Sequence, residues 1–245
     1  MEKGTMVMEN TSMNVWRLIL LSLIALFNLS PSWITEWSYD QDNLSMQLSS
    51  FNHLRAIEPL LVAQVDGMKY CLDLLDGQAV ITVCEPDQME VAWQSPSGWQ
   101  VREAFFSDLN RDGVPEATLL VWREFQPWPV DRFLLSGGRI ASFHDSNGRS
   151  CQVILIGMKN GAFKEVWAGS AMADPLHQIH AVDLDDDGLE ELAGLEYPYD
   201  GNDHRSSLVV WEWNGFGFTL GDRKTGSYSN LQIVSDQQDK LLMVQ

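Results

Sequence analysis

The stretch Asp-Leu-Asp-Asp-Asp-Gly-Leu-Glu-Glu, residues 183–191, decides how the rest of the chain is interpreted. Oxygen-bearing side chains stand at positions 1, 3, 5 and 9 of this stretch, and glycine stands at position 6. Hard cations such as Ca²⁺ take six to eight oxygen ligands, and a tightly coiled loop can point alternate side chains at one centre. Glycine permits the sharp turn that a Cβ would obstruct. The predicted metal ligands are Asp183, Asp185, Asp187, the backbone carbonyl of Leu189, and Glu191.

A second copy of the pattern lies upstream, where residues 108–116 read Asp-Leu-Asn-Arg-Asp-Gly-Val-Pro-Glu. The same positions carry oxygens, and glycine is again sixth. One acidic cluster is usually a solvated turn, but two copies in the same register, each leading into an apolar run, favour a cation site. The predicted ligands here are Asp108, Asn110, Asp112, the carbonyl of Val114, and Glu116.

These turns do not have the pattern of an EF-hand, which needs a bidentate Glu at position 12. Position 12 is Leu119 in the first copy and Gly194 in the second. In the first copy the last ligand is followed directly by the apolar run 117–122, which is typical of a strand. The helix–loop–helix interpretation is therefore excluded.

At these residues the chain resembles the FG-GAP or VCBS repeat family, the repeats of integrin-α-like β-propellers. The resemblance covers residues 59–245. It implies that a short D-x-D-x-D-G-x-x-[D/E] loop joins two strands and holds calcium. It therefore implies two Ca²⁺ sites in this chain, one in each nine-residue turn.

Three segments of the chain can be laid over one another. Each contains two β-rich runs separated by a turn, then a polar connection and a strand that enters an acidic loop. The interval from turn to acidic position is nearly constant: 21 residues from Asp87 to Asp108, 23 from Asn160 to Asp183, and 22 from Asn214 to Asp236. Such spacing across divergent residues indicates a repeated unit. The Asn-Gly pairs at 160–161 and 214–215 are strong hairpin signals.

The repeats predict an all-β, propeller-like array of about three four-stranded blades, with units at about 59–112, 113–187 and 188–245. In this interpretation the calcium loops lie at the blade junctions. The turns at 65–67 and 236–239 look like decayed copies, and neither is expected to bind a metal tightly. Propellers usually have at least four blades. An open stack, closure by a second chain in a homo-oligomer, or a closing strand at 240–244 therefore all stay open.

The N-terminal 32 residues contain an apolar run, 18–27, preceded by Lys3 and Arg17. The run is too short for an ordinary membrane-spanning helix, which needs about 20 residues, and suits the core of a secretory signal of about 7–15 residues. We expect a hydrophobic helix that is a signal peptide or an uncleaved anchor; a buried helix of a cytosolic protein is the remaining alternative. Residues 33–58 are read as a linker or an ordering segment, which could form at most part of a fourth blade.

Composition limits the classes of partner. The formal net charge is −18, which argues against nucleic acid because binding to phosphates requires clustered Lys and Arg. There are three cysteines, Cys71, Cys84 and Cys151. A hairpin turn at 76–77 would place Cys71 opposite Thr82, so that Cys84 is only a diagonal neighbour. Diagonal Cβ atoms lie about 7–8 Å apart or slightly less, which disfavours a bridge between them.

A long connection follows the first acidic turn and its strand. It spans about residues 123–150, and long loops on a rigid scaffold often carry function. The candidates there for partner contact are Trp128, Asp131, Arg132 and Arg139; the alternative is an insertion that covers a blade edge or the mouth of the ring. His144-Asp145 is better explained as structural because no nucleophile motif accompanies it. The H-x-x-H spacing of His177 and His180 is also better explained as structural, because on a strand or loop the two rings do not share a face as they would at helical spacing.

The sequence thus predicts an exported, calcium-stabilised module that is not an enzyme and that contacts a protein or glycan outside the cytosol. Any membrane contact would be made by the N-terminal segment. The alternative is a glycan-acting enzyme with its site in the 123–150 insertion and with purely structural calcium. The second turn has four carboxylates and the first has three plus Asn110, so charge count predicts tighter binding at the second.

Overall fold

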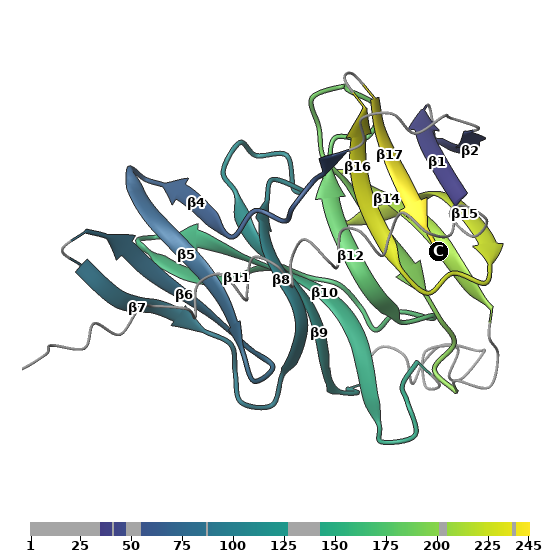
Figure 1. The fold of residues 1–245 in the computed structure, drawn as a ribbon. Coiled ribbons are helices and arrows are strands. Elements are labelled where there is room, and N and C mark those ends of the chain that lie inside the picture. The colour runs from purple at the N-terminus through teal and green to yellow at the C-terminus, as the bar shows by residue number, and fades with distance from the viewer. Residues whose placement is uncertain are drawn as a thin grey trace, which may run out of the picture. The chain divides into compact units, whose positions relative to one another are not determined.

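The computed structural model describes residues 35–40, 42–47, 55–86, 88–126, 143–200, 205–236 and 239–245. These residues form four antiparallel sheets and no helix, arranged as a four-bladed β-propeller (Figure 1). The all-β prediction is confirmed, whereas the prediction of about three blades is wrong. Residues 1–32, with the predicted signal or anchor, lie outside the described part, as do Trp128, Asp131, Arg132 and Arg139. Within the described part, no helix is long and apolar enough to cross a membrane.

Three of the sheets each use one continuous part of the chain. The first contains β4 (Val62–Val65), β5 (Met68–Leu75), β6 (Gln78–Glu85) and β7 (Gln88–Gln94). The second contains β8 (Gln100–Ser107), β9 (Glu116–Glu124), β10 (Arg149–Lys159) and β11 (Ala162–Ala168). The third contains β12 (Leu176–Val182), β13 (Glu191–Glu196), β14 (Ser206–Trp213) and β15 (Phe218–Gly226).

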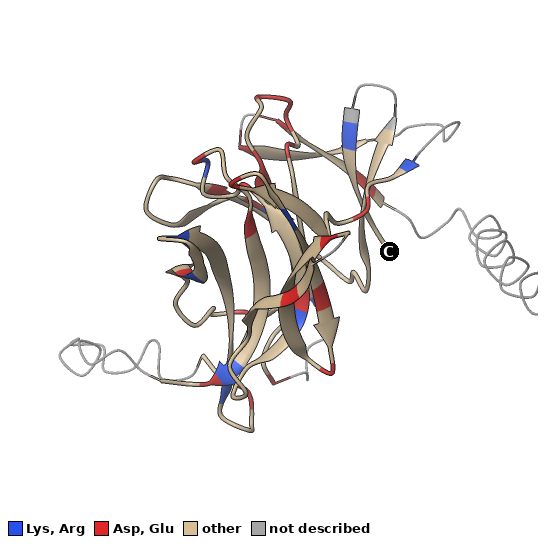
Figure 2. Ribbon diagram, turned by 90° about the vertical axis from the view of Figure 1, so that its left-hand side faces the viewer, with Lys and Arg blue, Asp and Glu red and all other residues tan. Residues whose placement is uncertain are grey.

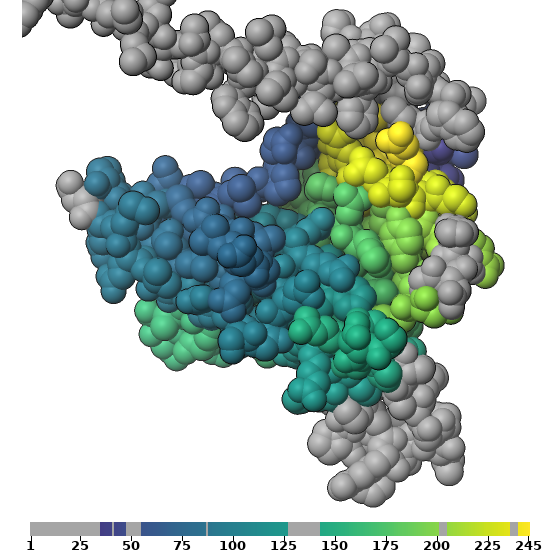
Figure 3. Space-filling view, turned by 60° about the horizontal axis from the view of Figure 1, so that its bottom comes forward, coloured from purple at the N-terminus to yellow at the C-terminus, as the bar shows by residue number. Residues whose placement is uncertain are grey.

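The fourth sheet joins strands from distant parts of the chain. Its spatial order is β2-β1-β17-β16-β3, made of β1 (Thr35–Asp40), β2 (Asn43–Gln47), β3 (Arg55–Ala56), β16 (Leu231–Asp236) and β17 (Asp239–Val244). Trp37 pairs with Leu242, so a strand from early in the chain adds to the last hairpin. The described residues between 35 and 58 thus contribute three strands to the fourth sheet, and a strand is present at the predicted position 240–244, within β17. In Figure 3 the visible surface changes colour from blue through green to yellow, so successive parts of the chain follow one another across this face.

Apolar faces hold neighbouring sheets together, since each sheet must bury its apolar side chains against another layer. One core cluster joins the first and second sheets through residues such as Tyr70 and Ile156. A second joins the second and third sheets around Trp122 and Leu192, and a third joins the third and fourth around Trp37. β9 is buried over most of its length because it lies between two of these cores.

Hydrogen bonds link the innermost segments of the sheets. The Phe106 amide of β8 donates to the Leu60 carbonyl (2.7 Å), and the Ile57 amide donates to the Ile233 carbonyl of β16 (2.9 Å). The Ile179 amide of β12 donates to the half-buried Glu103 carboxylate of β8 (2.6 Å). Segment 57–60 therefore connects the fourth sheet to the second at the centre of the propeller.

The acidic turns lie within blades and not at blade junctions. Ser107 of β8 pairs with Glu116 of β9, and Val182 of β12 pairs with Glu191 of β13. Each turn thus joins the first two strands of one sheet, and the predicted unit boundaries are displaced by one strand. The predicted boundaries were wrong because a nine-residue connection is compatible with a hairpin as well as with a crossing between sheets.

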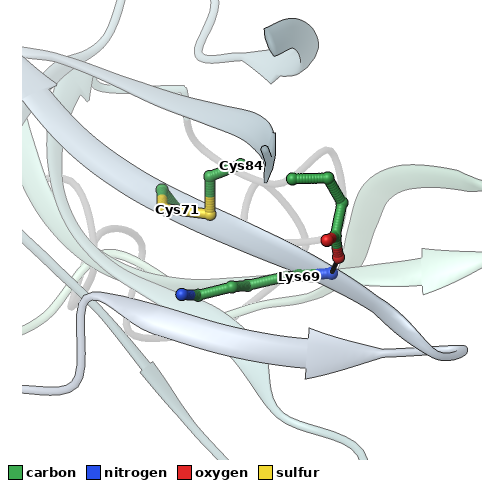
Figure 4. Close-up of a disulfide and its surroundings, with 4 residues drawn as sticks. Lys69, Cys71 and Cys84 are labelled. Carbon is green, nitrogen blue, oxygen red and sulfur yellow. Dashed lines mark hydrogen bonds between the residues drawn. A yellow bond between two sulfur atoms is a disulfide. The ribbon is translucent and has the colours of Figure 1, made fainter. Parts of the chain in front are cut away.

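A disulfide joins Cys71 and Cys84, against the sequence expectation (Figure 4). The predicted register is correct, because Cys71 does pair with Thr82. The diagonal Cα atoms are nevertheless only 5.8 Å apart, within the range of disulfides. Strand twist shortens one diagonal of a hairpin and lengthens the other, and the expectation ignored this. Cys151 is a buried free thiol.

Candidate metal centre

The two nine-residue turns share two unusual backbone positions. Position 4 has a positive φ in both, 63° at Arg111 and 59° at Asp186. Position 6 also has a positive φ, 85° at Gly113 and 87° at Gly188. This left-handed region costs little for glycine, so glycine at position 6 has the backbone role that the sequence predicted for it.

Matching hydrogen bonds hold the two turns. At the first turn, the Gly113 amide donates to Asp108 Oδ2 (3.0 Å) and the Val114 amide to Asp112 Oδ1 (2.9 Å). At the second turn, the Gly188 amide donates to Asp183 Oδ2 (3.2 Å), and the Leu189 amide donates to Asp187 Oδ1 (2.7 Å). The carboxylates at positions 1 and 5 are thereby fixed facing the inside of each loop.

Three carboxylates converge in each turn. Single oxygens of Asp108, Asp112 and Glu116 lie within 4.8 Å of one another, and so do those of Asp183, Asp185 and Asp187. Three oxygens at this spacing could bind one cation together. Six of the predicted carboxylate ligands are therefore brought together, and Glu191 is not in the second group. Asn110 lies beside the first group, where its Nδ2 donates to Asp112 Oδ2 (3.2 Å).

The side chain at position 9 differs between the turns. Glu116 is 3% exposed and points into the first cluster, where its Oε2 has no hydrogen-bond partner among the described residues. Glu191 is equally buried but turns away, because its Oε2 accepts from the Leu184 amide (2.8 Å) and its Oε1 pairs with Arg111 (3.4 Å). The first turn uses position 9 in its cluster and the second uses position 3.

Burial raises the pKa of both position-9 carboxyls. The pKa of Glu116 is raised to about 8, chiefly by desolvation and next by repulsion from Asp112. The pKa of Glu191 is raised to about 7, again mainly by desolvation. A nearby cation would oppose both effects, since it favours the charged carboxylate.

Basic groups from neighbouring loops meet the second turn. Arg111, in the first turn, reaches Glu191, and Lys240 of β17 lies 3.7 Å from Asp183 and also pairs with Asp186. The Asp108 amide donates to Glu190 Oε2 (2.7 Å), which links the turns directly. Figure 2 shows more red Asp and Glu segments than blue Lys and Arg segments. Basic side chains are therefore scarce, and two of them, Arg111 and Lys240, lie at the second turn. Sequence reasoning missed both, although the basic residue at position 4 of the first turn was a visible signal.

The donor set fits a hard cation. Every converging ligand is an oxygen, which suits Ca²⁺ or Mg²⁺ and not a thiolate- or imidazole-binding metal. Two buried oxygens, Glu116 Oε2 and Asp183 Oδ1, have no partner among the described residues, and a cation would satisfy both. The structure thus contains two acidic groups that could hold a metal ion.

The other blades have short turns at the same place. β4 and β5 are joined by Asp66-Gly67, and β16 and β17 are joined at residues 236–239. All four turns thus connect two neighbouring antiparallel strands of one sheet. The two acidic groups found among the described residues both lie in the nine-residue turns.

The three histidines considered in the sequence analysis, His144, His177 and His180, make contacts that are typical of structural residues. His144 Nδ1 bonds the Asp145 carbonyl (2.7 Å), while the Asp145 carboxylate accepts from the Asn147 and Arg149 amides and so stabilises a turn. His177 packs against Trp122, and His180 lines a small central cavity of about 180 Å³. The two histidines of the H-x-x-H spacing are therefore in separate environments.

Comparisons with known proteins gave no match: neither a family model, nor a curated protein, nor a solved structure resembles this chain significantly.

Proposed function

We propose that this protein is an exported β-propeller module in which two Ca²⁺ ions stiffen the turns of two consecutive blades. In this proposal the module is not catalytic and presents its loops to a protein or glycan outside the cytosol. The chain would belong to the FG-GAP or VCBS type that its two acidic turns resemble. Asn110, Glu191 and the carbonyls of Val114 and Leu189 would complete the two ligand sets.

The observation that carries the proposal is the agreement between the turns. They share positive φ at positions 4 and 6 and the same side-chain-to-backbone hydrogen bonds, and each gathers three carboxylates. Like charges within 4.8 Å repel, so a turn built this way is costly without a cation. Ca²⁺ is favoured over Mg²⁺ because exposed loops of variable ligand number suit its flexible coordination.

Two features support a location outside the cytosol. The disulfide between Cys71 and Cys84 is of a kind that persists in oxidising compartments and is rare in the cytosol. Extracellular calcium modules work with dissociation constants of about 10⁻⁴–10⁻³ M, so even weak sites would be filled there. The apolar run at residues 18–27 supplies a possible export signal.

The non-catalytic assignment rests on how the candidate acid–base groups are engaged. The Asp145 carboxylate accepts two backbone amides, and the His144 ring contacts Phe125 and a carbonyl. The pair is thus committed to a turn. The alternative, a glycan-acting enzyme, would place its site at residues 123–150, most of which lie outside the described part.

Thermal melting with and without chelator tests the proposal. Each site filled at 100 times its dissociation constant stabilises by about 2.7 kcal/mol. For a domain of this size, 1 kcal/mol shifts Tm by roughly 2–4 °C. We therefore expect calcium to raise Tm by about 10–20 °C over the chelated protein, with Mg²⁺ less effective at equal concentration. Equal melting curves in calcium and chelator would refute the proposal.

A further inference from the structure

A groove of about 770 Å³ lies where the first sheet passes into the second, well away from both acidic turns in the sequence. Its walls come from the connection between β7 and β8, the end of β9, one residue of β10 and the segment 165–171. This volume falls within the range of known ligand sites, about 300–1,000 Å³. The side chains relevant to recognition are Trp99, Arg123, Gln152, Glu165 and Trp167.

One buried polar atom of a residue that lines the groove, Gln152 Oε1, lacks a hydrogen-bond partner among the described residues. Gln152 is only 6% exposed, and this oxygen meets no donor in the described part of the chain. Its amide nitrogen is engaged, since Nε2 donates to Ser150 Oγ (3.2 Å). A buried acceptor without a donor costs about 1–3 kcal/mol. Gln152 lines the groove, but its Oε1 is shielded from solvent in this conformation, so a turn of the side chain would be needed to bring that oxygen to a ligand hydroxyl.

Two indoles line the groove and are held in place by their neighbours. The Trp99 ring packs 6.5 Å from Trp93, and the guanidinium of Arg123 lies 5.4 Å from its centroid. The Trp167 indole donates its N–H to the Phe216 carbonyl (2.9 Å), so its polar atom is already satisfied. Trp167 therefore offers the groove mainly apolar surface. Aromatic surface beside hydrogen-bonding groups suits ligands with both C–H faces and hydroxyls.

Charge selects among such ligands. The groove has one basic residue, Arg123, and two acidic ones, Glu124 and Glu165, in a protein of net charge −18. Glu165 also raises the pKa of Arg123 against the larger lowering effect of burial, so the two side chains interact. An anionic ligand would meet unfavourable charge. The Glu and Gln side chains supply hydrogen-bond acceptors, and the Arg123 guanidinium supplies donors. Neighbouring hydroxyl groups of a ligand both donate and accept, so they match this set.

We propose that this groove binds a neutral oligosaccharide, with Trp99 and Trp167 contacting sugar faces and Gln152 Oε1 accepting from a hydroxyl. The proposal rests on the function proposed above and names its ligand class. The groove includes the first residues of the 123–150 connection but none of the four contact candidates predicted there. An extended peptide is the competing occupant, since the groove also runs along the outermost strand of the second sheet, β11.

The test uses the full chain in saturating calcium, after its calcium-dependent Tm shift has been measured. Probes are neutral hexasaccharides of β-1,4-glucan, α-1,4-glucan and β-1,4-mannan, an α-1,4-galacturonan hexamer, and a hexapeptide of alternating Val and Thr. Tryptophan fluorescence titration gives the affinities. The variants are Gln152→Leu and Trp99→Leu, and the matched control is Met89→Ser, which changes a residue 87% exposed outside the groove.

At least one neutral hexasaccharide should bind saturably and more tightly than the galacturonan or the peptide. Gln152→Leu and Trp99→Leu should each weaken that binding by about tenfold or more, and Met89→Ser by less than twofold. Gln152→Leu removes the Nε2–Ser150 hydrogen bond together with Oε1, so its Tm is measured alongside its affinity; Glu165→Gln, at the surface, is the second variant if that Tm falls. The proposal is overturned if no neutral hexasaccharide binds, if galacturonan or peptide binds more tightly, or if both groove variants bind as wild type. If that sample still showed the calcium-dependent Tm shift, the failure would concern the groove alone and the two proposed metal sites would be unaffected.

Discussion

The turns at 108–116 and 183–191 have positive φ at the same two positions. They differ in which carboxylates converge and in the basic side chains beside them. The first gathers positions 1, 5 and 9, with Glu116 buried and Glu116 Oε2 unpartnered. The second gathers positions 1, 3 and 5, while Glu191 is held by a backbone amide and by Arg111. The same loop geometry can therefore support two different oxygen sets.

This difference shows why formal charge alone is an incomplete guide to affinity. The second turn has one more carboxylate, but Lys240 lies beside Asp183, and Arg111 engages Glu191. Such cations repel an incoming divalent ion and compete with it for the same oxygens. The first turn has no cation within ion-pair distance of its three converging carboxylates in the described part of the chain.

The largest expected effect comes from removing a central ligand. Asp187→Asn should weaken calcium binding at the second turn by about 10–100-fold, and Asp112→Asn should weaken the first turn by less. Each change removes one carboxylate ligand. The number of charged ligands is one of the factors that set the calcium affinity of such loops over orders of magnitude. Calcium titration of each variant by calorimetry measures both losses.

Asp76→Asn is the matched control for these two variants. Asp76 also has a positive φ (50°), but it lies in the turn between β5 and β6, outside both acidic groups. It should leave both calcium affinities unchanged. If Asp112→Asn lost as much calcium affinity as Asp187→Asn, the number of carboxylates in each turn would not determine which site binds calcium more tightly.

A smaller effect should appear in the pH dependence of the chelated protein. The pKa of Glu116 is about 8 in the folded state against an ordinary value of 4.5, so folding favours its protonated form. The stability it contributes is full below about pH 4.5 and is lost as pH rises through about 8. Glu103, Glu191 and Glu196, each with a pKa raised to about 7, act in the same direction.

The variant Glu116→Gln isolates the contribution of the first turn. In chelator its Tm should fall less between pH 5 and pH 8 than that of the wild type, because a buried charge no longer forms there. In saturating calcium the wild type should lose the part of this fall that Glu116 contributes, since the ion binds the deprotonated carboxylate. Parallel pH profiles of variant and wild type in chelator would contradict the role given to Glu116.

The smallest effect concerns the cation beside the second turn. Lys240→Gln should strengthen calcium binding there by about threefold and leave the first turn unchanged, because partly exposed charge pairs are worth only about 0.2–1 kcal/mol. Lys69→Gln is the control, as Lys69 lies in the first sheet away from both turns. Weaker binding after Lys240→Gln would show that the lysine orders the loop instead of competing with the ion.

Local features of the fold were predictable from the sequence. The two acidic turns, the hairpin that pairs Cys71 with Thr82, and the hairpin at Asn160-Gly161 all follow from turn chemistry over a few residues. Six of the predicted ligands converge for the same reason, since the spacing within a tight loop fixes where its side chains point.

Features that depend on distant residues were not predictable. The fourth blade requires Trp37 to pair with Leu242, and no local pattern encodes that pairing. The same limit applies to the groove, because Trp99, Gln152 and Trp167 come from three separate strands or connections. Assignment of the acidic turns to the inside of a blade likewise needed the pairing of β8 with β9. The diagonal disulfide depended on sheet twist, which residue spacing does not report.

Calcium titration of the chelated wild-type chain tests the central claim most directly. Isothermal calorimetry should give a stoichiometry of two calcium ions per chain, and one after either Asp112→Ala or Asp187→Ala, with the Asp76→Asn control still binding two. A wild-type chain that binds no calcium, or variants that keep both sites, would contradict the claim that these two turns are cation sites.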